Sequence, residues 1–124
     1  MRRNRRRRRA NGAPDDEGRI DRELAAVVRH VRGLPDVDPA RVVLLGHSMG
    51  AAAVVRVGAA DPRITATVAI SLGDSVVAAS RPGPRRLLLV AGALEPVAIR
   101  SITREALDAP TPGRRAIQVP VVEH

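Results

Sequence analysis

The sequence predicts an α/β fold, a partial parallel sheet of about four strands with helices on its faces. Two observations lead to this prediction. Short apolar runs rich in Val, Leu and Ile recur along the chain, and such runs are typical of strands buried on both faces. Segments with helical periodicity separate several of these runs, and this alternation favours parallel strands joined by helices.

The first half of the chain contributes two helices and one strand to this prediction. Apolar residues recur every three or four positions over residues 20–34, which indicates a helix that Gly33 and Pro35 end. Residues 41–45 (RVVLL) form the first buried strand. The small, apolar residues 51–60 are expected to form a helix that packs close to the sheet.

The second half repeats the pattern. Residues 65–72 (TATVAISL) and 86–91 (RLLLVA) are predicted strands, joined by a loop or partly helical link over residues 73–85. A helix over residues 96–107 precedes the last predicted strand, residues 116–121 (AIQVPV).

Composition narrows the classes of site that the chain can contain. Its 124 residues are enough for one domain, with no Cys, Phe, Tyr or Trp. Disulfides, thiolate metal sites and aromatic base-stacking platforms are therefore excluded. The core must consist of Val, Leu, Ile and Ala.

The first 18 residues differ in character from the rest. All 21 basic residues are arginine, and seven of them lie within residues 2–9, so the net charge of +8 belongs mainly to this segment. Like charges followed by Asn, Gly, Pro and acids are typical of disorder. No apolar segment of a secretory signal follows them, and no apolar run is long enough to span a membrane. We expect a disordered tail over residues 1–18, a domain over residues 19–124 and a cytoplasmic location.

Residues 46–50 (GHSMG) match the pattern G-x-S-x-G. They follow a predicted strand directly and open a predicted helix, which is the setting of a nucleophile elbow. Such a turn forces its serine into a strained backbone conformation, so the flanking residues must be small. Ser48 would lie at a helix N-terminus, where backbone N–H groups stabilise a developing oxyanion.

The segment 37–55 (VDPARVVLLGHSMGAAAVV) resembles the elbow region of the α/β-hydrolase family, in particular its esterase, lipase and dienelactone-hydrolase-like members. The resemblance implies a triad in the chain order serine, acid, histidine. Ser48 matches the nucleophile, Glu95 (in GALEP) the acid and His124 the histidine. In the implied acyl transfer His124 takes the Ser48 proton and Glu95 orients the imidazole. The backbone N–H of Met49 would be one oxyanion donor.

Other polar residues have weaker claims to this site. Asp74, just after the second strand, is the alternative triad acid, because the loop there can also reach the histidine in some members of the family. His47 is better explained as a turn residue and His30 as a surface residue of the first helix. No cluster has the spacing of metal ligands and no nucleotide-binding motif occurs, so we expect neither metal nor cofactor.

The resemblance covers residues 19–124 and corresponds to the C-terminal half of the family's fold. The family's first four strands have no counterpart, and with them goes the loop that supplies a second oxyanion donor. Losing one such donor typically costs about 10²–10³ in rate, so we expect a fragment with weak or no activity alone. The strand at 41–46 would have an unpaired apolar edge, which predicts self-association.

The function that the resemblance implies is hydrolysis of a small-molecule ester or related acyl bond by a serine hydrolase. The sequence does not identify the substrate, because fold does not set specificity. Two alternatives stay open: a non-catalytic remnant of the family, and a module whose arginines bind polyanions such as nucleic acid or anionic lipid without sequence specificity. A solvated tail without a binding role is the simpler interpretation of the arginines.

Overall fold

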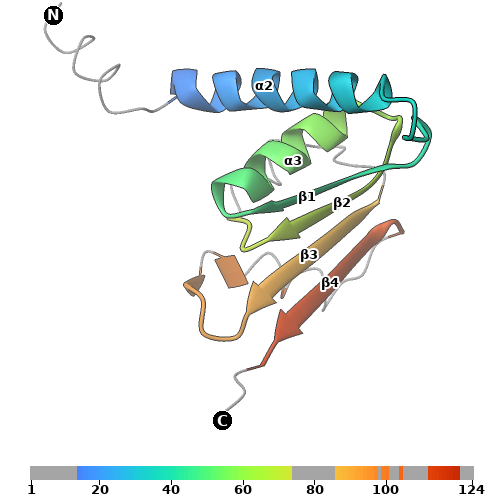
Figure 1. Ribbon diagram of the computed structural model, residues 1–124. Helices are drawn as coiled ribbons and strands as arrows, with labels where there is room; N and C mark the ends of the chain where they lie inside the picture. Colours follow the sequence, from blue (N-terminus) through green and yellow to red (C-terminus); the bar gives the residue numbers. More distant parts are fainter. Residues whose placement is uncertain (1–13, 74–85, 98, 101–103, 105–111, 121–124) are drawn as a thin grey trace, which may run out of the picture.

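The computed structural model describes residues 14–73, 86–97, 99–100, 104 and 112–120. The helices and strands of this part of the chain follow one another as shown in Figure 1. They are α2 (Pro14–Arg32), β1 (Val42–His47), α3 (Met49–Ala60), β2 (Ile64–Ile70), β3 (Leu87–Gly92) and β4 (Arg114–Val119).

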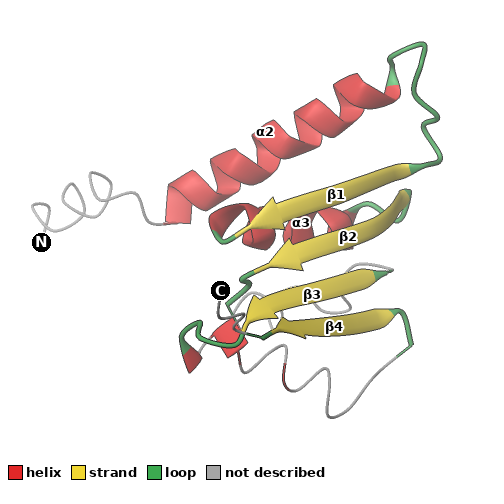
Figure 2. Ribbon diagram, turned by 60° about the horizontal axis from the view of Figure 1, so that its bottom comes forward, coloured by secondary structure: helices red, strands yellow, loops and turns green. Residues whose placement is uncertain are grey.

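The four strands form one parallel sheet in the order β1-β2-β3-β4. Spatial order equals chain order, so each connection leads to the neighbouring strand. The carboxyl ends of all four strands therefore lie at the same edge, as the arrowheads in Figure 2 show. This arrangement confirms the predicted α/β class, a sheet of four parallel strands with helices packed on it.

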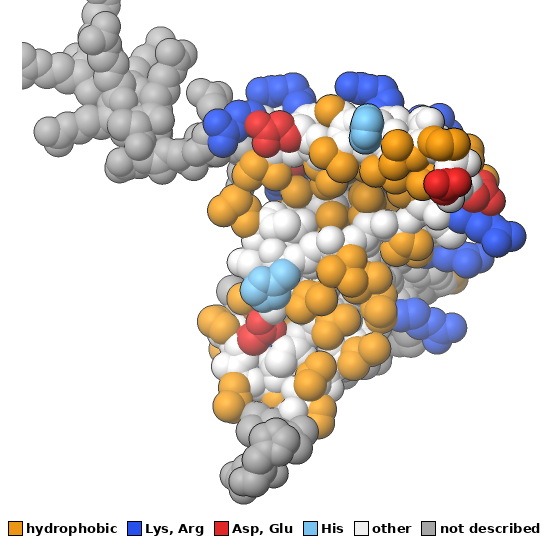
Figure 3. All heavy atoms as spheres, in the orientation of Figure 1, with side chains coloured by type: hydrophobic (Ala, Val, Ile, Leu, Met, Phe, Trp, Pro, Cys, Tyr) orange, Lys and Arg blue, Asp and Glu red, His pale blue; other side chains and the backbone are white. Residues whose placement is uncertain are grey.

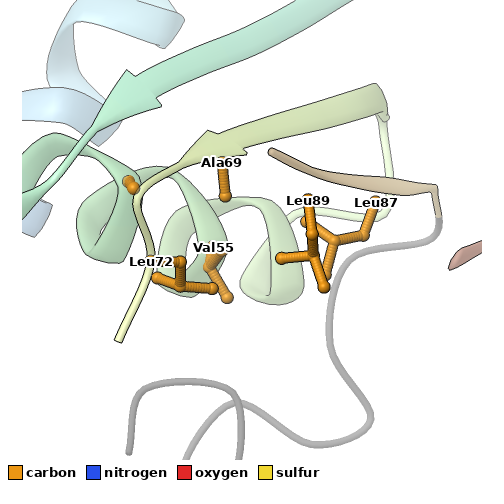
Figure 4. Close-up of a cluster of buried hydrophobic side chains, with 6 residues drawn as sticks. Val55, Ala69, Leu72, Leu87 and Leu89 are labelled. Carbon is orange, nitrogen blue, oxygen red and sulfur yellow. The ribbon is translucent and has the colours of Figure 1, made fainter. Parts of the chain in front are cut away.

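The core lies between the sheet and helices α2 and α3. The small residues of α3 let its backbone approach the strands closely, and Ala51 is completely buried there. Figure 4 shows Val55 of α3 beside Leu72, Leu87 and Leu89 in one of two clusters. The second cluster joins α2, α3 and the first two strands through Val28, Val42, Leu44, Val54, Val57 and Ile64.

The other face of the sheet is less covered, and here the expectation of strands buried on both faces is wrong for β1. Burial alternates strictly along β1, with Val43 55% and Leu45 66% exposed. Ile117 and Val119 of β4 are also exposed. The physical reason is that α2 and α3 pack on the same face, against the buried residues of the alternation. Figure 3 shows apolar side chains gathered over the strands.

Two ion pairs attach α2 to α3: one to a residue within α3, and one to Asp61, the residue that follows α3. The Arg56 guanidinium donates to both carboxylate oxygens of Asp21, at 2.7 and 3.0 Å. The Arg32 guanidinium donates to Asp61 at 2.5 Å. This hydrogen bond lowers the pKa of the Asp61 carboxyl below its ordinary value, although partial burial opposes the change.

Several element boundaries differ from those expected. Helix α2 begins at Pro14, inside the segment expected to be disordered, because proline suits the first helical position, where no N–H partner is needed. Strand β4 begins two residues early, at Arg114, and ends before Pro120. Of the helix expected at 96–107, residues 97, 99, 100 and 104 are helical. The rest of that helix, residues 74–85 of the link and residues 1–13 of the tail lie outside the described residues.

Candidate active site

Ser48 lies between the end of β1 and the start of α3, at the carboxyl edge of the sheet. Its backbone has φ 53° and ψ −113°, a conformation that residues with a Cβ atom rarely adopt. This geometry confirms the strained turn expected from the motif. The Ser48 N–H donates to the Ile70 carbonyl at 2.9 Å, while the Ser48 carbonyl accepts the Ala52 N–H at 3.2 Å. The side chain is exposed and makes no capping hydrogen bond to α3.

The two glycines of the motif have different roles. A Cβ on Gly46 would meet the Gly50 carbonyl group and lie 2.8 Å from the Ala51 nitrogen. The start of α3 therefore passes too close to β1 for any larger residue at position 46. A Cβ on Gly50 would have nothing within 4 Å. The protein backbone thus requires the first glycine, whereas the second leaves open space at the start of the helix.

The start of α3 offers hydrogen-bond donors beside Ser48. The first N–H groups of a helix have no partner within the helix, and Met49 and Gly50 are its first two residues. The Met49 side chain is 64% exposed. Any contribution of Met49 to an oxyanion site would therefore come from its backbone N–H.

Glu95 lies in the turn that follows β3, and its carboxylate has a hydrogen-bond donor on each oxygen. The Gly92 N–H donates to Oε2 at 2.7 Å, and the Ser71 hydroxyl donates to Oε1. Ser71 is only 8% exposed and follows the last residue of β2. The carboxylate is therefore held in a defined orientation from the ends of two neighbouring strands.

One backbone and one side-chain hydrogen bond at the end of β2 connect Ser48 to Glu95. Ile70 accepts the Ser48 N–H, and the next residue, Ser71, contacts Glu95. The Ser71 N–H itself donates to the Val90 carbonyl at 2.8 Å. Two consecutive residues of one strand end therefore touch the candidate nucleophile and the candidate acid.

Of the three histidines in the chain, the structure describes His30 and His47. His124 and the alternative acid Asp74 lie outside the described residues. His47, the last residue of β1, and His30 of α2 are both exposed. The sequence predicts Ser71 only as part of the strand over residues 65–72 and indicates no role for it in the site. The available signal was a hydroxyl residue at the carboxyl end of an apolar run.

Three further observations concern the described part of the chain outside this edge of the sheet. No group of three or more His, Asp or Glu there could hold a metal ion. A pocket lined by Pro39, Ile64 and Arg86 lies at the amino edge of the strands, opposite Ser48. Among the described helices, none is both long and apolar enough to cross a membrane.

Comparison with known proteins gives one family. A family model described as "Alpha/beta hydrolase family" matches residues 6–122, which is most of the chain. No curated protein matches the sequence.

Proposed function

The chain belongs to the α/β-hydrolase family, and we propose that it is a serine hydrolase that cleaves an ester or a related acyl bond. The observation that carries the proposal is the geometry of Ser48. An exposed serine in a strained turn, between a parallel strand and the N-terminus of a helix, is the arrangement of an activated nucleophile.

The proposed reaction has two steps. The Ser48 hydroxyl attacks the acyl carbon while His124 takes its proton, and His124 then gives this proton to the departing alcohol. A water molecule next attacks the acyl-enzyme; its proton passes through His124 back to the Ser48 oxygen, and the acid is released. The Met49 N–H donates to the oxyanion in both steps.

Glu95 is proposed as the acid that holds the His124 imidazole in the required tautomer. Its support is the fixed carboxylate at the same sheet edge as Ser48, two strands away. Asp74 is the competing candidate. Glu95→Gln should strongly reduce the rate at which Ser48 reacts with a fluorophosphonate, and Asp74→Asn should reduce it only weakly. The reverse result would assign the role to Asp74.

The direct test is modification by a fluorophosphonate, which reacts with activated serines. We expect the unaltered chain to be modified at Ser48, identified by peptide mass spectrometry, and Ser48→Ala to remain unmodified. Thr65→Ala serves as control and should react like the unaltered chain, because it removes a hydroxyl at the opposite end of the sheet. A native chain that is not modified at Ser48 would favour the non-catalytic remnant.

Catalytic turnover is a separate expectation. Hydrolysis of a short-chain nitrophenyl ester by the isolated chain should be weak or undetectable, and a robust rate that depends on Ser48 would contradict this.

Deletion of residues 2–9 should not alter the modification of Ser48. If that deletion abolishes binding to a polyanion such as heparin, the arginines have a binding role of their own. Cell fractionation would test the expected cytoplasmic location.

We also propose that β1 mediates self-association. Within the described residues β1 pairs with β2 alone, and its exposed Val43 and Leu45 lie next to the open edge. An apolar edge strand with unpaired backbone groups is a template for pairing with a second chain.

A further inference from the structure

We propose that Ser71 is a positioning residue that holds Glu95 in the orientation in which its carboxylate can accept a hydrogen bond from the His124 imidazole N–H. This inference rests on the proposed function, because it assumes that Glu95 is the triad acid. It assigns a role to a residue that neither the motif nor the resemblance identified.

The backbone of Ser71 is fixed in an unusual conformation. Its φ is 58°, in the left-handed region that residues other than glycine rarely adopt. The Ser71 N–H donates to the Val90 carbonyl at 2.8 Å, which ties the residue to β3. Because Ser71 is also buried, its hydroxyl has little freedom to turn toward solvent. Positive φ values persist where the surrounding structure enforces them, and they cluster at functional sites.

The hydroxyl of Ser71 completes a two-point attachment of the carboxylate. The Gly92 N–H holds Oε2 at 2.7 Å, and the Ser71 hydroxyl holds Oε1. One donor alone would let the carboxylate turn about that single contact, whereas two donors fix its plane. A carboxylate has about four acceptor sites, so capacity to accept an imidazole N–H remains after these two bonds.

The location of Ser71 also couples the acid to the nucleophile. Its preceding residue, Ile70, accepts the N–H of Ser48 at 2.9 Å. The strand end that positions Ser48 is thus the one that positions Glu95. The Ser71 hydroxyl therefore holds the acid at a strand end that also holds the backbone of the nucleophile.

The test compares the rate of fluorophosphonate modification at Ser48 in four proteins: the unaltered chain, Ser71→Ala, Glu95→Ala and the double variant. Loss of one hydrogen bond to the charged acid should slow modification about tenfold in Ser71→Ala. In the Glu95→Ala background the same change should have no further effect, because no carboxylate remains to be positioned. Ser71→Gly, which also lacks the hydroxyl but suits a positive φ, should be as slow as Ser71→Ala and covers the case in which Ser71→Ala does not fold.

The outcomes separate this inference from the proposed function. If the unaltered chain is modified at Ser48 and both Ser71 variants react at its rate, the positioning role is wrong and the proposed function stands. An equal slowing with and without Glu95 would show a merely structural role and would also overturn the inference. If the unaltered chain is not modified at Ser48, the proposed function fails and the inference fails with it.

Discussion

The conformation of Ser48 makes a prediction about stability that does not depend on catalysis. With φ 53° and ψ −113°, the Cβ of this residue is held in a sterically unfavourable position. Glycine has no Cβ, so Ser48→Gly should relieve the strain and stabilise the chain. The Ser48 side chain makes no capping hydrogen bond, and its removal therefore carries little cost of its own.

Two opposing effects determine the magnitude. A residue held in a sparsely populated backbone region costs about 1–3 kcal/mol. Glycine loses more conformational freedom on folding, which takes back about 0.5–1 kcal/mol. The net gain for Ser48→Gly should be about 1 kcal/mol. For a chain of 124 residues this corresponds to a rise in Tm of roughly 3–5 °C.

The assay is reversible urea unfolding of Ser48→Gly against Ser48→Ala. Both variants lack the hydroxyl and differ only in the Cβ, so the comparison isolates the backbone conformation. We expect the midpoint of Ser48→Gly to be higher by roughly 0.5 M. If Ser48→Gly is as stable as Ser48→Ala or less stable, the turn stores no strain and the reasoning is refuted.

Three further predictions concern packing, pH and association. Gly46→Ala should lower the free energy of unfolding by about 1–3 kcal/mol, because its Cβ meets the Gly50 carbonyl. Gly50→Ala should be neutral or stabilise the helix by up to about 1 kcal/mol. Equal effects of the two variants in urea unfolding would contradict the steric argument. Because the pKa of Asp61 is lowered in the folded state, its carboxylate stabilises the fold above the ordinary carboxyl pKa of about 3.9, and this contribution is lost as pH falls through the folded value. Asp61→Asn should therefore unfold more easily by about 1–2 kcal/mol at pH 7 and by less at pH 3; a difference that does not change with pH would exclude this linkage. Leu45→Lys should reduce self-association in sedimentation velocity. Val27→Lys should not, although Val27 of α2 is a similarly exposed apolar residue (56% exposed). Equal effects of the two variants would show that β1 is not the interface.

The elbow could be predicted from sequence because its information is contiguous. Residues 46–50 hold the two glycines, the serine and the start of the helix, and the apolar run before them identifies the strand. The spacing of neighbouring residues was therefore sufficient to identify Ser48 as the candidate nucleophile. The motif treats its two glycines alike, however, and only the approach of α3 to β1 shows that Gly46 alone is required by space.

Apolar runs also predicted the parallel sheet, but they could not show which faces the helices cover. Val43 and Leu45 are as apolar as Val42 and Leu44, so the sequence predicts burial for all four. The packing of α2 and α3 on one face buries Val42 and Leu44 and leaves the other two exposed.

The strands, the helix that follows Ser48 and the candidate nucleophile could be predicted from the chain alone, since each depends on neighbouring residues. The environment of Glu95 depends instead on the tertiary structure. Ser71 and Glu95 are 24 residues apart, and they meet because β2 and β3 pair in parallel, which brings both strand ends to one edge. A hydrogen bond of this kind depends on strand register and backbone conformation, which spacing along the chain does not encode.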